Sequence, residues 1–194
     1  HCISSAASDV YKRQLEGPFL AHARRGAHPA EHIAAPSLQA LEERIGGFET
    51  DIALITLAPE QTGSQQLVQR LGALGIITAL GHSTADVDQA AQAFDQGVRM
   101  LTHSLNAMPG LHHRAPGPVG EACRRGDVAL GLIADGVHVH PTMAVLLQRL
   151  AADQLVLVSD ALAPYGLDDG VHRWDERVLL VLSLIHISEP TRRR

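Results

Sequence analysis

The chain has 194 residues, of which 45% are hydrophobic and 19% are charged, and it carries a formal net charge of -5 with an isoelectric point near 6.2. This composition is typical of one globular domain with a buried core, and it excludes a fibrous repeat or a disordered chain. The acidic balance provides no electrostatic footprint for nucleic acid, and no apolar run approaches the roughly 18 residues of a membrane span, so we expect neither partner.

Cysteine usage points to a reducing environment. The two cysteines, Cys2 and Cys123, lie far apart in the sequence. We therefore expect neither a disulfide framework nor a zinc site built from thiolates. A cytoplasmic protein is the corresponding expectation.

The two ends of the chain differ in character from the sequence between them. Residues 1–14 and 183–194 do not continue the periodic pattern, and they resemble translated sequencing-adapter sequence. We expect both to be non-native tails and exclude them from the fold prediction. The domain is expected to span residues 15–182, and a natural arm at each end is the alternative.

Between these ends, short apolar runs alternate with stretches of helical periodicity. Most of the runs are continuous, which is typical of parallel strands covered on both faces. The alternation predicts an α/β fold with a parallel sheet. In chain order, the expected elements are a helix over 37–45, a strand over 52–57, a helix over 63–74, a strand over 76–80, a helix over 84–96, strands over 98–102 and 129–134, a helix over 141–151 and a strand over 155–159.

Two of these helices carry signals at their first residues. Ser83 or Thr84 is expected to cap the helix over 84–96, with Asp86 and Asp88 in its first turn, where a carboxylate complements the helix dipole. Pro141 suits the first helical position because its missing N–H would have no partner within the helix there.

Polar side chains follow the predicted strands at their C-terminal ends. Enzymes built on a (β/α)8 barrel carry their catalytic residues at this position. A doubly wound open sheet also binds ligands at this edge, but it usually uses only the units beside its switch point. Contributions from several consecutive units therefore favour the barrel. The residues concerned are Glu16, His82, His103, Asp135 with His138, and Asp160.

Metal binding is the strongest local chemical inference. Glu16, His82 and His103 would provide one carboxylate and two imidazoles, a set suited to zinc, with iron as the alternative, that leaves a position for water. A metal bound there lowers the pKa of its water and polarises a carbonyl. A single histidine after a strand is more often a structural residue, so the prediction depends on repetition at successive strand ends.

Seven short motifs in this chain are similar to those of one known family. They are Leu15-Glu16-Gly17-Pro18-Phe19, Gly26-Ala27-His28, Gly81-His82-Ser83, Thr102-His103 with Asn106-Ala107-Met108, His113-Arg114-Ala115-Pro116-Gly117, Asp135-Gly136-Val137-His138-Val139-His140-Pro141, and Asp160-Ala161 with Ala163-Pro164. In this order they resemble the N-acetylglucosamine-6-phosphate deacetylases of the amidohydrolase superfamily. The resemblance implies a truncated (β/α)8 TIM-type barrel that lacks its N-terminal strands and a small β-sandwich domain.

The resemblance also implies a reaction, in which a metal-dependent enzyme hydrolyses N-acetylglucosamine 6-phosphate to glucosamine 6-phosphate and acetate. It implies that Glu16, His82 and His103 bind the divalent metal. Asp160 matches a general base that then acts as general acid. His138 matches a histidine that contacts the substrate and polarises the acetamide carbonyl.

Further positions match residues that contact the substrate in the family. Ala27 and His28 match residues of the sugar site, and Asn106 with Ala107 matches a pair that meets the phosphate. Arg114 matches an arginine that reaches the phosphate across a dimer interface, so the full-length parent is expected to be a homodimer. The implied substrate-binding residues are Ala27, His28, Asn106, Ala107, Arg114, Asp135 and His138.

The chain departs from the family pattern in a few places. Gln14 stands where the family usually has a histidine, and Ser104-Leu105 replaces a more usual leucine-phenylalanine pair. The absent strands include the region in which related amidohydrolases carry a His-x-His pair, which leaves open whether the site holds one metal ion or two. We expect the isolated chain to be inactive.

Two alternatives stay open. The parent could deacetylate another sugar phosphate, such as N-acetylgalactosamine 6-phosphate, or it could be a non-catalytic protein that binds metal or sugar phosphate. Asp160 beside the metal candidates favours an enzyme, because binding alone needs no proton shuttle. In isolation, Glu16 could mark a turn and Asp160 could cap a helix, so the functional interpretation depends on the whole set.

Overall fold

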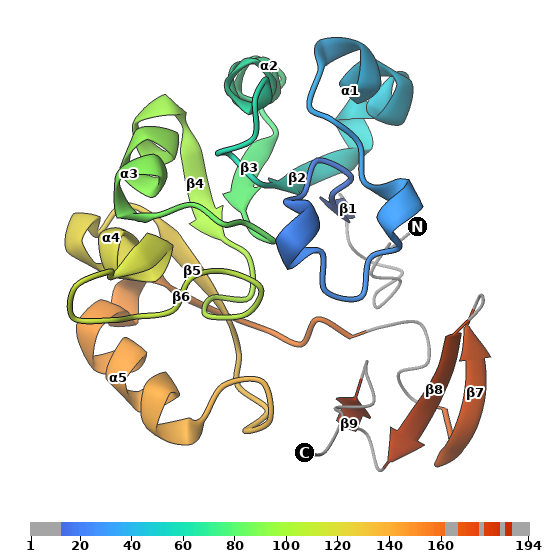
Figure 1. Ribbon diagram of the computed structural model, residues 1–194, viewed down its shortest axis with the longest axis vertical. Coiled ribbons are helices and arrows are strands. Elements are labelled where there is room, and N and C mark those ends of the chain that lie inside the picture. Colours follow the sequence, from blue (N-terminus) through green and yellow to red (C-terminus); the bar gives the residue numbers. More distant parts are fainter. Residues whose placement is uncertain (1–12, 162–166, 175–176, 183–184, 188–194) are drawn as a thin grey trace.

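A curled, six-stranded parallel sheet forms the main body of the protein. The computed structural model describes residues 13–161, 167–174, 177–182 and 185–187. The strands follow one another in chain order, and the helices lie on the outside of their arc (Figure 1). The result is half of a barrel, which confirms the predicted α/β fold. The strands are β1 (Arg13–Glu16), β2 (Ile52–Leu57), β3 (Ile77–Leu80), β4 (Val98–Leu101), β5 (Ala129–Ile133) and β6 (Leu155–Val158).

In the part of the chain that the structure describes, five α-helices and four short 3-10 turns connect the strands of the six-stranded sheet. Four of the helices were expected from periodicity, whereas α4 was not. Its Gly117 and Gly120 lower helix propensity, and burial of Val119 and Ala122 stabilises it instead. The helices are α1 (Leu38–Ile45), α2 (Ser64–Ala73), α3 (Val87–Gln96), α4 (Gly117–Arg125) and α5 (Pro141–Ala151), and the turns are His22–Arg24, Ala30–His32, Glu49–Asp51 and Ala152–Gln154.

The start of α3 differs from the prediction. Its cap is Asp86, whose side chain accepts hydrogen bonds from the backbone of Asp88 and Gln89, while the Gln89 side chain accepts from the backbone N–H of Asp86. This capping box satisfies the free donors of the first turn, so neither Ser83 nor Thr84 is needed there. The other expectations hold: Asp88 lies in the first turn of α3, and α5 begins at Pro141.

The core lies between the sheet and its helices, and a polar contact crosses the sheet near its C-terminal edge. The largest fully buried side chains include Phe19, Phe94, Leu57 and Leu101. The hydroxyl oxygens of Thr56 and Thr102 lie 2.7 Å apart and are buried. Gly81, directly after β3, lies between these two threonines, because a Cβ atom added to it would be 2.7 Å from Thr56 Cγ2 and 2.8 Å from Thr102 Cβ.

A second sheet is antiparallel and was not predicted. It consists of β7 (Gly170–Trp174), β8 (Arg177–Leu182) and β9 (Ile185–Ile187). Its last strand falls within the segment expected to be a non-native tail. At the other end, Arg13 and Gln14 pair with β2 across an irregular register, although they too belong to an expected tail. The assignment of the tails stays a prediction.

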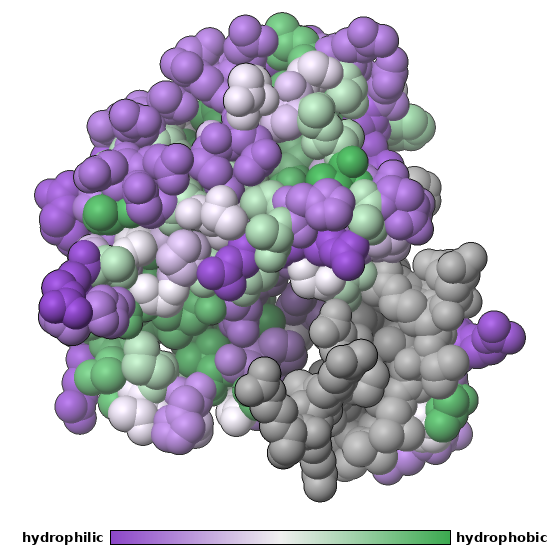
Figure 2. Space-filling model, in the orientation of Figure 1, coloured by the Kyte–Doolittle hydropathy of each residue, from purple (hydrophilic) through white to green (hydrophobic). Residues whose placement is uncertain are grey.

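One region of the half-barrel exposes apolar side chains. They come from α5 and from β6, which pairs with β5 as the last strand of the sheet. Figure 2 shows hydrophobic residues gathered over the region of α5, whereas hydrophilic residues largely cover α1 to α3. None of the helices in the described part of the chain combines the length and apolarity that a membrane crossing requires. The exposed apolar residues of this region are Val145, Leu146, Leu150, Val156 and Leu157.

We expect Gly81→Ala to lower the free energy of unfolding by about 1–3 kcal/mol, because the added methyl group would press against two β-branched side chains that cannot move aside. Gly72→Ala is the matched control. It lies in α2 with no atom within 4 Å of the added Cβ, so it should stabilise the chain by about 0.4–1 kcal/mol. Urea unfolding checks both values, and equal effects of the two substitutions would contradict the prediction.

Candidate active site

The candidate site residues lie at the C-terminal edge of the six-stranded sheet. Glu16 is the last residue of β1. The other four candidates in this group share one placement, because each is the second residue after its strand ends. They are His82 after β3, His103 after β4, Asp135 after β5 and Asp160 after β6.

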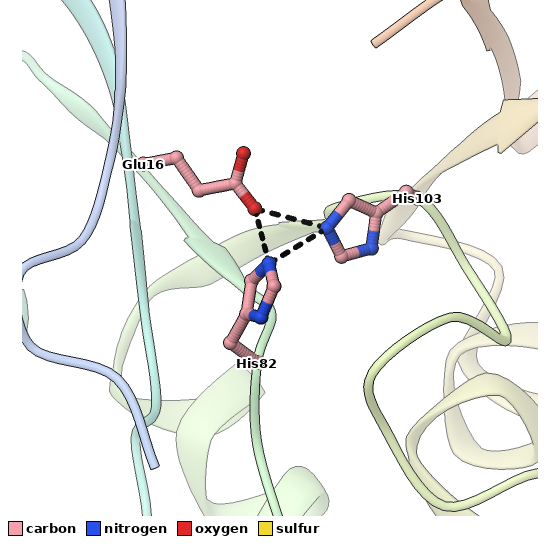
Figure 3. A group of neighbouring side chains, drawn as sticks. All are labelled: Glu16, His82 and His103. Carbon is pink, nitrogen blue, oxygen red and sulfur yellow. Dashed lines mark hydrogen bonds and ion pairs between the residues drawn. The ribbon is translucent and has the colours of Figure 1, made fainter. Parts of the chain in front are cut away.

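Glu16, His82 and His103 point toward one another (Figure 3). The Oε1 atom of Glu16 lies 2.5 Å from Nε2 of His82 and 2.9 Å from Nε2 of His103. The two Nε2 atoms are 3.1 Å apart. The three potential ligand atoms therefore converge on one point, and both imidazoles are buried.

The protonation pattern of this cluster suits a bound cation. Nδ1 of His82 lies 2.7 Å from the backbone carbonyl oxygen of Arg24, which can only accept a hydrogen bond. Nδ1 must therefore carry the proton, and in the neutral ring Nε2 presents its lone pair to Glu16 Oε1, which is also an acceptor. A metal ion would satisfy these facing lone pairs, and a backbone carbonyl is a common outer partner of a metal-binding histidine.

Electrostatics within the cluster favour a charged carboxylate. Burial raises the pKa of Glu16, but the nearby imidazoles, His103 first, and the charge of His103 outweigh that effect and hold this pKa well below its ordinary value. Burial lowers the pKa of His103, yet the hydrogen bond to Glu16 and the charge of Glu16 prevail and raise it. Both shifts therefore favour the charged forms of Glu16 and His103.

The backbone at the site is unusual. His82, His103, Ala107 and Asp160 all have positive φ angles, of 47°, 32°, 50° and 49° respectively. Residues with side chains rarely adopt this region, and such conformations cluster at functional sites where surrounding contacts hold them. Here the backbone carbonyl of His82 accepts a hydrogen bond from the Ala21 N–H at 2.8 Å.

Asp160 lies within electrostatic reach of the cluster. Its side chain keeps access to solvent, but the surrounding protein partly desolvates the carboxyl, and this is the main reason that its pKa is raised. The negative charge of Glu16 raises the pKa further, whereas the histidines oppose the shift. A carboxyl group with a raised pKa can both accept and donate a proton.

His138 and Asp135 form a pair of their own. Nδ1 of His138 lies 2.6 Å from Oδ2 of Asp135, and the other carboxylate oxygen accepts from the backbone N–H groups of Val137 and His138. Burial raises the pKa of Asp135, but these hydrogen bonds outweigh it and lower that pKa. Asp135 thus fixes the His138 ring and leaves Nε2 available.

The remaining candidates lie at different distances from the cluster. Nε2 of His28 is 3.8 Å from Glu16 Oε1, and its ring meets the His82 ring edge-on; Ala27 precedes it. Asn106 donates to the carbonyl of His103 at 3.3 Å, and the carbonyl of Ala107 accepts from the Ser83 N–H at 3.0 Å.

Arg114 is not joined to this group. Its side chain is exposed, and within the described ranges its guanidinium has no hydrogen bond or ion pair with another candidate.

Two contributors were missed at the sequence level. Arg24 acts through its backbone carbonyl, for which a side-chain pattern carries no signal. Glu60 binds the segment after His82 through hydrogen bonds to Ser83 and Thr84. It follows the predicted strand over 52–57 by three residues, so the same search for polar residues after strands could have found it.

Comparison with known sequences gives consistent matches, although no family model matches the chain. It is 40% identical over 166 residues to an N-acetylglucosamine-6-phosphate deacetylase of Bos taurus, covering 81% of this chain and 40% of the relative. A protein of the same name from Vibrio furnissii is 34% identical over 87% of this chain and 42% of its own length. An N-acetylgalactosamine-6-phosphate deacetylase of Escherichia coli O157:H7 is 38% identical over 84% of this chain and 43% of its own length.

Solved structures agree with these sequence matches. An N-acetyl-D-glucosamine-6-phosphate deacetylase mutant from Mycobacterium smegmatis, in complex with N-acetyl-D-glucosamine-6-phosphate, superposes with a TM-score of 0.81 at 32% identity, over 88% of this chain and 45% of that one. An N-acetylglucosamine-6-phosphate deacetylase from Thermotoga maritima superposes with a TM-score of 0.79 at 34% identity, over 89% of this chain and 46% of that one. The chain therefore spans less than half the length of its relatives.

We expect the stability of the metal-free chain to depend on pH in two windows. The raised pKa of His103 contributes stability that is complete below the ordinary value of 6.5 and is lost as the pH rises through the folded value. The lowered pKa of Glu16 contributes stability above 4.5 that is lost as the pH falls through its folded value. Urea unfolding in a chelator, from about pH 4 to pH 9, checks this. Steadily rising stability above pH 6.5 would contradict it.

We also expect His82→Ala and Glu16→Gln each to weaken metal binding by more than about 100-fold, because each removes a ligand atom rather than an outer contact. Titration calorimetry with Zn²⁺ as the probe measures this. His112→Ala, at an exposed position, is the matched control and should bind as the wild type does. Equal affinities for all the variants would show that the cluster is not the binding site.

Proposed function

Given that the chain is a relative of the N-acetylglucosamine-6-phosphate deacetylases over most of its own length, we propose that it is part of a metal-dependent hydrolase. The reaction removes the acetyl group from N-acetylglucosamine 6-phosphate and gives glucosamine 6-phosphate and acetate. The observation that supports this most directly is the convergence of Glu16, His82 and His103 at the C-terminal sheet edge, with Asp160 in electrostatic reach.

The proposed metal ligands are Glu16, His82 and His103. Their donor set of one oxygen and two nitrogens suits zinc best, with iron as the alternative. When bound, such an ion supplies Lewis acidity toward the acetamide carbonyl and toward a water molecule. The buried imidazoles and the Arg24 carbonyl that fixes the His82 tautomer keep the ligand atoms aimed at one point.

Asp160 is the proposed proton shuttle. Its carboxylate takes a proton from the attacking water as the new C–O bond forms at the carbonyl carbon. The same proton then goes to the amide nitrogen as the C–N bond breaks, so that the amine leaves in neutral form. The raised pKa of Asp160 fits this double role, because a carboxyl of ordinary pKa returns a proton less readily near neutral pH.

His138 is proposed to contact the acetamide carbonyl oxygen. The hydrogen bond from Nδ1 to Asp135 fixes the ring, and in the doubly protonated ring Nε2 donates a hydrogen bond to that oxygen as negative charge develops on it. In this proposal Asp135 acts through His138, which narrows its predicted role in substrate binding.

The substrate contacts follow the position of each residue around the cluster. His28 and Ala27 are proposed to line the sugar site, since His28 lies against Glu16 and His82. Asn106 and Ala107 are proposed to meet the phosphate. The exposed Arg114 is proposed to reach the phosphate bound by a second subunit, in a cytoplasmic homodimer of the full-length protein.

The chain spans 40–46% of the length of its relatives, and we propose that residues 15–182 form one portion of the parent barrel. Residues 1–14 and 183–194 are proposed to be non-native. The exposed apolar side chains of α5 and β6 support the proposal of a partial barrel, since a closed barrel would cover that side of the sheet. The isolated chain is then expected to lack turnover.

The test is an assay of acetate release from N-acetylglucosamine 6-phosphate by the metal-loaded product of the full-length source gene. We expect turnover in the wild type and a loss of at least about 1,000-fold in Asp160→Asn with metal content retained, because general acid and general base are lost together. Asp153→Asn, an exposed aspartate in the turn before β6, is the matched control and should keep full activity.

Other outcomes would change the proposal. Faster turnover of N-acetylgalactosamine 6-phosphate would transfer the assignment to that sugar, the activity named for the Escherichia coli relative. Sugar-phosphate binding without turnover by folded, metal-loaded protein would show a binding protein. Full activity in Asp160→Asn would remove the proton shuttle from the mechanism.

A further inference from the structure

Glu60 lies in the loop between β2 and α2, and its carboxylate binds the segment that follows His82. One oxygen accepts from the Ser83 hydroxyl at 2.7 Å. The other accepts from the Thr84 backbone N–H at 2.7 Å and from the Thr84 hydroxyl at 3.0 Å. We propose that Glu60 is a positioning residue that holds the His82 loop so that Nε2 of His82 points at the metal site. This inference rests on the metal site of the proposed function.

The His82 loop needs such support because of its backbone conformation. His82 has a φ of 47°, in a region that residues with side chains rarely adopt and that surrounding contacts stabilise. Before the loop continues, the His82 carbonyl is held by the Ala21 N–H at 2.8 Å. The two residues that follow His82, Ser83 and Thr84, are hydrogen-bonded to Glu60. Hydrogen bonds to a carboxylate are stronger than those between neutral groups, so Glu60 provides the firmest hold on this side.

Ser83 extends the effect of Glu60 to a second loop. It is fully buried, and its N–H donates to the carbonyl of Ala107 at 3.0 Å. Ala107 lies in the loop that follows His103, the other imidazole of the cluster. Glu60, Ser83 and Ala107 therefore form a continuous chain of hydrogen bonds from the loop after β2 to the loop after β4. The two histidine-bearing loops are fixed relative to each other through this chain.

The neighbouring helices do not account for these contacts. The first turn of α3 is capped by Asp86 with Gln89, and α2 begins after Gly63. The hydrogen bonds of Glu60 go to the loop instead, and they reach both residues directly after the proposed ligand. Placement of His82 is thus the structural role that these contacts support.

The test measures metal binding by the 194-residue chain rather than turnover. Zn²⁺ affinity is measured by competition with a chromophoric chelator, and the visible spectrum of bound Co²⁺ reports on ligand geometry. We expect Glu60→Ala to weaken Zn²⁺ affinity by about 10–100-fold and to change the Co²⁺ spectrum, as loss of an outer partner of a metal ligand does. Glu60→Gln keeps one acceptor oxygen and should show a smaller change in both.

Glu42→Ala is the matched control. Glu42 also binds through its carboxylate, to Arg70 at 2.9 Å, but the pair is exposed and joins α1 to α2. This variant should leave the Zn²⁺ affinity and the Co²⁺ spectrum unchanged. Glu60→Ala combined with Ser83→Ala should weaken Zn²⁺ binding by less than the product of the two single effects, because both substitutions remove the contact between Glu60 and Ser83, and the serine change adds only the loss of the hydrogen bond from the Ala85 N–H.

The outcomes separate this inference from the proposed function. A folded wild-type chain that binds no Zn²⁺ would overturn the metal site, and this inference with it. A wild type that binds Zn²⁺, with affinity and spectrum unchanged in Glu60→Ala, would overturn the role of Glu60 alone. If circular dichroism shows that Glu60→Ala is unfolded, then Glu60→Gln and Ser83→Ala decide, and wild-type binding in both would equally reject the proposal.

Discussion

The parallel pairing of the strands is the constraint on which the site depends. Glu16 pairs with Thr56 in β2, and β2, β3 and β4 continue in the same direction. Because all the strands end at one edge, the residues that follow them meet there whatever their separation along the chain. This is how Glu16 and His103, 87 positions apart in sequence, come to share a contact of 2.9 Å.

Strand direction alone does not aim the side chains, and the loops complete the arrangement. The atoms that hold His82 are mainly backbone groups and one carboxylate, supplied by Ala21, Arg24, Ala107 and Glu60 through Ser83. Gly131 allows a further close approach, since a Cβ atom there would lie 3.3 Å from the backbone nitrogen of His103. Pre-organised ligand atoms of this kind are what a metal site requires.

Much of this fold follows from sequence pattern, and the exceptions have physical causes. The strand over 52–57 and the helix over 141–151 match the structure at both ends, because a continuous apolar run and an N-terminal proline are strong local signals. α4 was missed because tertiary burial overrides its weak helix propensity. The β7–β9 sheet is built from segments that neighbour one another along the chain, and its last strand lies in the tail that was excluded from the fold prediction.

The site shows the same division. The cluster of Glu16, His82 and His103 was found because each side chain follows a predicted strand, whereas the contribution of Arg24 lies in a carbonyl group that every residue possesses. Sequence can indicate which side chains reach the C-terminal edge of the sheet, but it does not show which backbone carbonyl groups accept hydrogen bonds from them.

The position of Glu16 on the first strand has a consequence for how the sheet holds together. β1 has four residues and pairs only with β2 within the described sheet. Edge strands of this length separate easily from their neighbours. Since Glu16 meets imidazoles carried by β3 and β4, an ion bound there would fasten the edge strand to the middle of the sheet. Ion binding and the pairing of β1 with β2 would then be thermodynamically coupled. Removal of the ion by a chelator would loosen β1 before the other strands.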